Sequence, residues 1–121
     1  MIALWIATAL LAVVYVGAGL LKTITPYEKL YVRDNFAWAR DFTPRSIRAL
    51  GIAELVGVIG LILPASTGIV PWLTPVSAIA FVFVQIGAIG VHVKHGERKG
   101  LPTNIVLLIL GALVTVGWIL V

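Results

Sequence analysis

Residues 51–64 read GIAELVGVIGLILP, a run in which thirteen of the fourteen positions are small, apolar or proline and the other is an acid, Glu54. Such a run, continued by apolar residues on its N-terminal side, predicts a helix that crosses a membrane. Moving an ionised carboxylate into hydrocarbon costs several kcal/mol, so Glu54 needs a partner, a proton or a hydrated pocket. The place of this carboxylate therefore bears on both the fold and the function.

The composition places the chain in a membrane rather than in water. Of its 121 residues, 60% are hydrophobic and 12% are charged, whereas soluble proteins carry about 25% charged residues. We expect one integral membrane domain over residues 1–121. The net charge of +4 does not indicate nucleic-acid binding, because the cationic residues flank apolar spans. The sequence has no cysteine, which excludes disulfides, thiol chemistry and thiolate metal sites.

Four apolar runs predict four membrane-spanning helices. The predicted helices cover residues 2–22, 44–64, 72–94 and 102–121. A helix needs about 20 residues to cross a hydrocarbon core of about 30 Å, and the length of each predicted helix is close to this value. The first run lacks a basic N-terminal region and is followed by positive charge, so we expect a span rather than a cleaved signal peptide. The predicted fold class is all-α: an integral membrane four-helix bundle.

The connection between the first two spans predicts an interfacial amphipathic segment over residues 25–42. In TPYE (25–28) we expect a capping box that starts a short helix, with Thr25 as N-cap, and TPR (43–45) repeats the pattern at the second span. Aromatic residues alternate with charged ones, which suits the headgroup layer. A docking surface for a protein partner is the alternative for four of these aromatics: Tyr27, Tyr31, Phe36 and Trp38.

The cationic side chains are distributed on one side of the spans. All nine lysines and arginines lie around the first and third connections: Lys22, Lys29, Arg33, Arg40, Arg45, Arg48, Lys94, Arg98 and Lys99. The positive-inside rule then predicts that connections 1 and 3 are cytoplasmic and that both termini lie outside. We expect a multi-pass protein of the cell membrane in this orientation.

Most of the notable polar side chains fall in the cytoplasmic half of the predicted bundle. Glu54 lies six residues beyond Arg48, about 9 Å along a helix, near the depth at which Lys22 leaves the first span. A Glu54–Lys22 ion pair is therefore expected. On the third span, Gln85 and His92 share one stripe that should face inward. Ala53 and Gly57 form a small-xxx-small pair that predicts a close helix crossing beside Glu54.

These residues, with Asn104 on the fourth span, form a candidate buried polar cluster: Lys22, Glu54, Gln85, His92 and Asn104. Three interpretations stay open for the Glu54 pair, namely a structural tie between helices, a ligand or proton site, and a partner contact. Structural alternatives for Gln85 and His92 are an interhelical hydrogen bond and a hydrated interfacial histidine.

Several stretches resemble the DoxX-like family: GAGLLK (17–22), GIAELVGVIGLILP (51–64), QIGAIGVHVKH (85–95) and PTNIVLLILGAL (102–113). The resemblance covers nearly the whole chain, and its site positions fall on Lys22, Glu54, Pro64, His92 and Asn104. It implies a four-helix membrane protein. Some members resemble subunits of a thiosulfate:quinone oxidoreductase or of an oxidative-stress membrane complex, and distant eukaryotic relatives look like receptor-assembly chaperones and cargo receptors. Fold transfers more readily than function in such a comparison.

Three functions from different classes follow. The leading one is an accessory or assembly subunit of a membrane complex, bound to a membrane-protein partner or to a second copy. The alternatives are a quinone-binding subunit of a membrane oxidoreductase and a conduit for a small solute or proton. We expect no catalysis by the chain alone and no metal site, because the sequence has no phosphate loop, nucleophile elbow or zinc-protease pattern. A quinone is the one cofactor considered.

The predicted orientation can be tested by thiol labelling in intact cells. Single cysteines at Ser66 and Val121 should react with an impermeant reagent added outside, and one at Asn35 should not, because the cationic connections face the cytoplasm. Labelling of the Asn35→Cys protein from outside would overturn the orientation.

Overall fold

The computed structural model describes residues 1–34 and 36–121, and this part of the chain is all-helical, without strands. Its four long helices are α1 (Ile2–Ile24), α3 (Pro44–Thr67), α4 (Leu73–Lys94) and α5 (Leu101–Leu120). Each is long and apolar enough to cross a membrane. The short helices α2 (Tyr27–Leu30) and η1 (Ala37–Asp41) lie in the first connection. The predicted all-α fold with four spans is confirmed.

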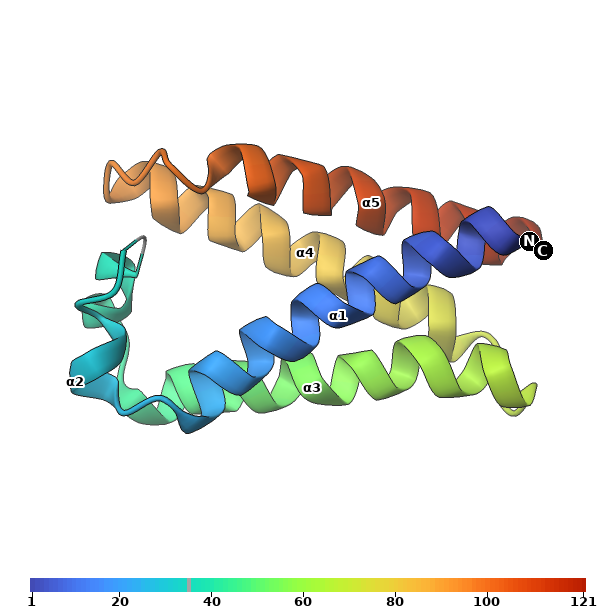
Figure 1. Ribbon diagram of the computed structural model, residues 1–121, viewed down its shortest axis with the longest axis horizontal. Coiled ribbons are helices and arrows are strands. Elements are labelled where there is room, and N and C mark those ends of the chain that lie inside the picture. Colours follow the sequence, from blue (N-terminus) through green and yellow to red (C-terminus); the bar gives the residue numbers. More distant parts are fainter. Residues whose placement is uncertain (35) are drawn as a thin grey trace.

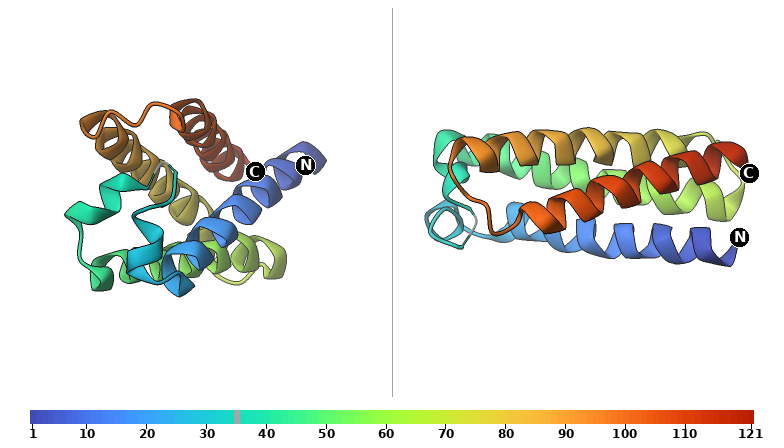
Figure 2. Two further views of the ribbon diagram at one scale, coloured as in Figure 1. Left: turned by 60° about the vertical axis from the view of Figure 1, so that its left-hand side comes forward. Right: turned by 90° about the horizontal axis from the view of Figure 1, so that it is seen from above.

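The long helices form two hairpin-like pairs, α1 with α3 and α4 with α5 (Figure 1). Both termini and the α3–α4 connection lie at one end of the bundle, here called the terminal end. Helices α2 and η1 and the α4–α5 connection lie at the other, here called the basic end (Figure 2). The two pairs approach each other near the terminal end and diverge toward the basic end. The first and third connections therefore share one end, as the charge pattern requires.

The start of α3 follows the sequence prediction, but its end does not. Thr43 is the N-cap: its hydroxyl oxygen accepts a hydrogen bond from the Ser46 amide at 3.1 Å, and Pro44 opens the helix. The predicted end at Pro64 is wrong, because α3 runs on to Thr67. The Thr67 hydroxyl donates back to a carbonyl of the last turn, and Gly68, with φ of +74°, ends the helix in the left-handed conformation.

The predicted capping box at Thr25 is also wrong. Helix α1 continues to Ile24, two residues beyond the predicted end, and the Thr25 amide donates to the Leu21 carbonyl at 3.2 Å. Thr25 therefore terminates α1 instead of starting α2. The N-cap of α2 is Pro26, which makes no side-chain cap hydrogen bond.

The connection over residues 25–42 packs across the basic end and has a small core of its own. Its buried residues are Leu30, Trp38 and Ala39, and they pack with Ile47 of α3. The Tyr27 hydroxyl donates to main-chain carbonyls near η1, the nearest at 2.9 Å. Asn35, where the labelling test places a cysteine, lies outside the described residues. The segment thus acts as a cap on the bundle.

The main crossing of α1 and α3 occurs at two glycines. A Cβ atom on Gly51 would lie 2.8 Å from the Gly19 carbonyl oxygen, and one on Gly19 would lie 2.9 Å from the Gly51 carbonyl oxygen. The crossing was predicted at Ala53 and Gly57, but Ala53 is exposed and Gly57 faces the Phe81 ring of α4. A small-residue pair within one helix does not specify which neighbour it meets, so the sequence pattern selected the wrong pair.

Replacing Gly51 should therefore destabilise the protein strongly. A leucine there must push α1 and α3 apart, and overpacking of this kind costs about 1–3 kcal/mol. Gly17→Leu is the matched control, because a Cβ at Gly17 of α1 has nothing within 4 Å. Thermal unfolding in detergent, followed by circular dichroism, should show a lower midpoint for Gly51→Leu alone. Equal midpoints for the two variants would contradict the crossing.

Candidate functional site

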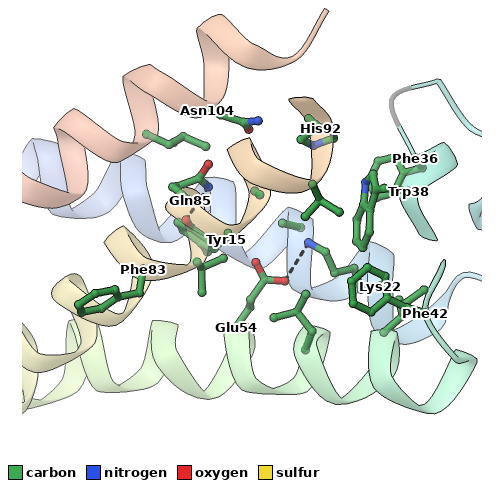
Figure 3. A pocket seen from close by; sticks show the side chains of 18 of the residues that line it. Tyr15, Lys22, Phe36, Trp38, Phe42, Glu54, Phe83, Gln85, His92 and Asn104 are labelled. Carbon is green, nitrogen blue, oxygen red and sulfur yellow. Dashed lines mark hydrogen bonds and ion pairs between the residues drawn. The ribbon is translucent and has the colours of Figure 1, made fainter. Parts of the chain in front are cut away.

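A cavity of about 420 Å³ lies at the basic end, where the two helix pairs diverge (Figure 3). Its polar and aromatic lining residues come from all four long helices and the first connection: Tyr15, Lys22, Phe36, Trp38, Phe42, Ser46, Glu54, Phe83, Gln85, His92 and Asn104. The five residues of the predicted polar cluster therefore line one cavity. This placement makes the cavity the candidate site.

The predicted ion pair between Lys22 and Glu54 is present. The Lys22 Nζ lies 2.9 Å from the Glu54 Oε1, and the two side chains are 11% and 2% exposed. Each residue lies one turn beyond a crossing glycine, Gly19 or Gly51. Because helical side chains lean toward the N-terminus of their helix, those of the antiparallel α1 and α3 lean toward each other across this crossing. The Gly19–Gly51 contact thus brings the two charges together.

A second polar contact joins the two helix pairs. The Gln85 Nε2 of α4 donates to the Tyr15 Oη of α1 at 2.6 Å, and the Tyr15 hydroxyl faces the Phe81 carbonyl at 3.3 Å. The Tyr15 ring stacks on the Phe81 ring, with 3.8 Å between centroids. Tyr15 was missing from the predicted cluster, because an aromatic residue inside an apolar run looks like core. Its spacing of seven residues from Lys22, two helical turns, was the available signal.

Three polar atoms of cavity-lining residues are buried without a hydrogen-bond partner. They are the Gln85 Oε1, the Asn104 Nδ2 and the Trp38 Nε1. The His92 Nδ1 instead faces the Glu97 Oε1 of the α4–α5 connection at 3.5 Å. An unpartnered buried polar group costs about 1–3 kcal/mol. Together the three atoms offer one acceptor and two donors, which suits a small neutral molecule with oxygen atoms.

The four aromatic residues that were predicted as a possible partner contact differ in how deeply they are buried. Trp38 is buried and meets the His92 ring edge to face, with 6.2 Å between centroids. Tyr27, Tyr31 and Phe36 are half-buried and pack against the same small core. Replacing Trp38 would therefore disturb the cap on the bundle, and contact with a partner stays a prediction.

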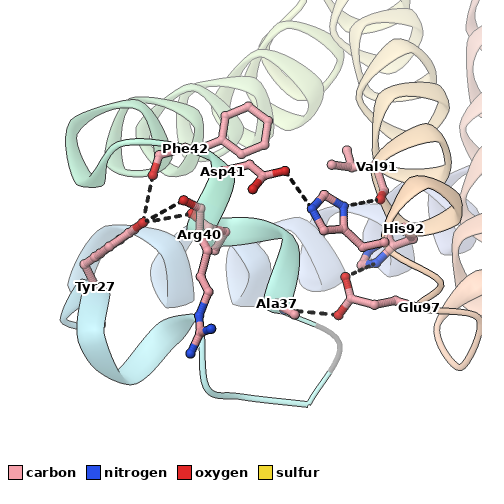
Figure 4. Close-up of polar contacts among 10 residues, drawn as sticks. Tyr27, Ala37, Arg40, Asp41, Phe42, Val91, His92 and Glu97 are labelled. Atoms are coloured by element: carbon pink, nitrogen blue, oxygen red, sulfur yellow. Dashed lines mark hydrogen bonds and ion pairs between the residues drawn. The ribbon is translucent and has the colours of Figure 1, made fainter.

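The α4–α5 connection fastens this cap to the bundle (Figure 4). The His95 Nε2 lies 2.7 Å from the Asp41 Oδ2 of η1, and its Nδ1 lies 2.8 Å from the Val91 carbonyl. The Ala37 amide donates to the Glu97 Oε2 at 3.1 Å. The pKa of His95 is raised above its usual range. The hydrogen bond to the Val91 carbonyl is the largest cause, and the contact with Asp41 raises the pKa further. Sequence reasoning missed the His95–Asp41 and Ala37–Glu97 contacts, because they join residues more than 50 positions apart.

The comparison with protein families agrees with this architecture. The model of the DoxX-like family matches residues 6–114, most of the chain. The chain therefore belongs to the DoxX-like family and is a multi-pass membrane protein. No curated protein and no solved structure matches it. Within residues 1–34 and 36–121, no three His, Cys, Asp or Glu side chains gather in a way that could hold a metal ion.

Removing one partner of the Lys22–Glu54 pair should cost more stability than removing both. A single Glu54→Leu change leaves a buried ammonium group unpaired, which costs about 3–5 kcal/mol, whereas replacing both members by apolar residues is often neutral. Thermal unfolding of Glu54→Leu, Lys22→Leu and the double variant forms a double-mutant cycle. If the effects of the single changes simply add, the two groups do not interact energetically.

Proposed function

We propose that this member of the DoxX-like family is an accessory subunit of a membrane complex and that it holds a small, neutral, lipid-soluble molecule of the quinone class at its basic end. One observation carries the proposal: the unpartnered polar atoms of Gln85, Asn104 and Trp38 belong to residues that line a single cavity. A bound molecule with oxygen atoms would satisfy them.

The chemistry of a quinone matches this set of groups. The carbonyl oxygens of a quinone accept hydrogen bonds, which suits the Asn104 amide and the Trp38 indole as donors. The hydroxyls of the reduced form also donate, which suits the Gln85 Oε1. The Lys22–Glu54 pair is neutral as a unit, so the cavity does not favour a charged ligand. Its volume of about 420 Å³ is in the range of small-molecule sites, roughly 300–1,000 Å³.

The role proposed for the chain is to hold this molecule for another protein. Without cysteine, the chain has no thiolates for an iron–sulfur cluster or a redox-active dithiol. Electrons for a bound quinone would come from a partner subunit. The family resemblance implies complexes of this kind, a thiosulfate:quinone oxidoreductase or an oxidative-stress membrane complex. Isolation of the native complex in mild detergent, with spectra of any bound chromophore, would identify the partner.

The alternative of a conduit for a small solute or proton has less support. Between the cavity and the terminal end, the bundle is filled by Leu11, Leu61 and Val114, whose exposure is 0%. The stacked rings of Tyr15 and Phe81 lie beside them in the same core. The cavity is thus a pocket in one half of the bundle, which suits binding better than passage.

Asn104→Leu separates binding from stability. Leucine is close to asparagine in size, and it removes an amide nitrogen that has no partner, so the variant should unfold at the same temperature or higher. Its affinity for decylubiquinone should fall about two- to tenfold, the value of one hydrogen bond. The measurement is the rise in unfolding temperature with quinone concentration, which reports binding to the folded state.

Thr103→Val serves as the control, because Thr103 is the exposed neighbour of Asn104 and does not line the cavity. This variant should bind the quinone as the unaltered protein does. The proposal fails if decylubiquinone does not stabilise the unaltered protein, or if Asn104→Leu and Thr103→Val are stabilised equally.

A further inference from the structure

We infer that the cavity opens sideways into the bilayer through a gap between α3 and α4, and that its ligand is an amphipath whose hydrocarbon chain lies in this gap. The inference rests on the proposed function for the head group but concerns the route and the chain. It predicts that a water-soluble head group alone is a poor ligand.

The gap follows from how α3 and α4 pack. Near the terminal end the two helices are in close contact, where a Cβ on Gly57 would lie 2.7 Å from the Phe81 ring. Toward the basic end they diverge (Figure 1). In this divergent part, Ser46 of α3 and Phe83 and Gly87 of α4 line the cavity and are also exposed, Phe83 by 67%. Phe83 is more exposed than the other exposed large apolar residues of the lining, Phe42 at 42% and Val14 at 40%, which puts the main mouth of the cavity beside Phe83.

The lining residues between α1 and α5 are less exposed than Phe83. Val14 of α1 is 40% exposed, Ala18, Lys22 and Asn104 are partly exposed, and Leu107 is buried. We therefore place the main opening on the α3–α4 side.

The route from water at the basic end is covered by the cap. Trp38 and Ala39 of η1, in the first connection, are buried against the bundle. The His95–Asp41 and Ala37–Glu97 contacts hold η1 against the α4–α5 connection (Figure 4), and Lys99 contacts Asp34. A ligand that arrives from the membrane does not need to break these contacts.

The position of Gly87 suits a hydrocarbon chain. Gly87 lies seven residues before Lys94, the last residue of α4, which is about 10 Å along the helix. This depth falls within one half of a hydrocarbon core about 30 Å thick. A Cβ on Gly87 would have nothing within 4 Å, so the helix surface leaves open space at the mouth. A chain lying there stays in an apolar environment while the head group reaches Gln85 and His92.

Thiol labelling tests the opening without any ligand, because the natural chain has no cysteine. Ala18→Cys places a single thiol on the part of the cavity wall that α1 forms. We expect it to react with membrane-dissolved N-dodecylmaleimide and to react slowly with a sulfonated maleimide in water. Each rate is divided by that of Arg98→Cys, an exposed position at the basic end.

Two second-site changes then locate the route. Gly87→Phe fills the mouth and should slow the dodecylmaleimide reaction at least about fivefold. Gly90→Phe is the matched control, because Gly90 also has nothing within 4 Å but does not line the cavity. Phe83→Ala widens the mouth and should speed the reaction, which keeps the test decisive if Gly87→Phe does not fold.

The inference is wrong if Gly87→Phe and Gly90→Phe react alike, if Phe83→Ala leaves the rate unchanged, or if the sulfonated reagent labels Ala18→Cys as fast as Arg98→Cys. A second arm compares decylubiquinone with the same quinone lacking its chain, and Gly87→Phe should weaken only the binding of the chained form. A positive labelling result with no quinone binding would uphold the opening and reject the proposed head group, so the two failures are distinguishable.

Discussion

The contact of α1 with α3 at Gly19 and Gly51 is the constraint on which the basic end of this protein depends. With no side chain on either residue, the two backbones approach within the space that a methyl group would fill. The helical lean of side chains then directs Lys22 and Glu54 toward each other across the crossing. A carboxylate that hydrocarbon would otherwise exclude is thereby neutralised in place. The acid at residue 54 can remain in an apolar run because two glycines in different helices bring its partner within reach.

The two halves of the bundle differ in how tightly their helices pack. At the terminal half, Leu11, Leu61 and Val114 leave no exposed surface between the helices. At the basic half the helix pairs separate, and the space between them is bordered by the Gln85 Oε1, the Asn104 Nδ2 and the Trp38 Nε1, which have no hydrogen-bond partner within the described residues. Unsatisfied buried groups of this kind reduce stability. The ligand proposed for the cavity would satisfy them.

The sequence predicts the spans well, because helix length and hydrocarbon thickness leave little freedom. It also predicts the partner of Glu54, since a buried charge in a membrane has few solutions and Lys22 is at a matching depth. The wrong predictions rest on local sequence patterns that tertiary contacts override. Thr25 has the residue pattern of a cap but ends the preceding helix. Ala53 has small-residue spacing but faces outward. The Tyr15–Gln85 and His95–Asp41 contacts depend on which segments of the chain become neighbours. The periodicity of a single helix does not contain this information.

The arrangement of two sequential pairs has a consequence for how the protein assembles. Most contacts between long helices lie within α1–α3 and α4–α5, so each pair is built from neighbouring segments and can form early, at a low cost in chain entropy. The Lys22–Glu54 contact belongs to the first pair, and His92 and Asn104 belong to the second. The hydrogen bonds of the Tyr15 hydroxyl with Gln85 and with the Phe81 carbonyl link one pair to the other beside the cavity. The cavity thus comes into being only when the pairs dock, and formation of the cavity and completion of folding are the same event.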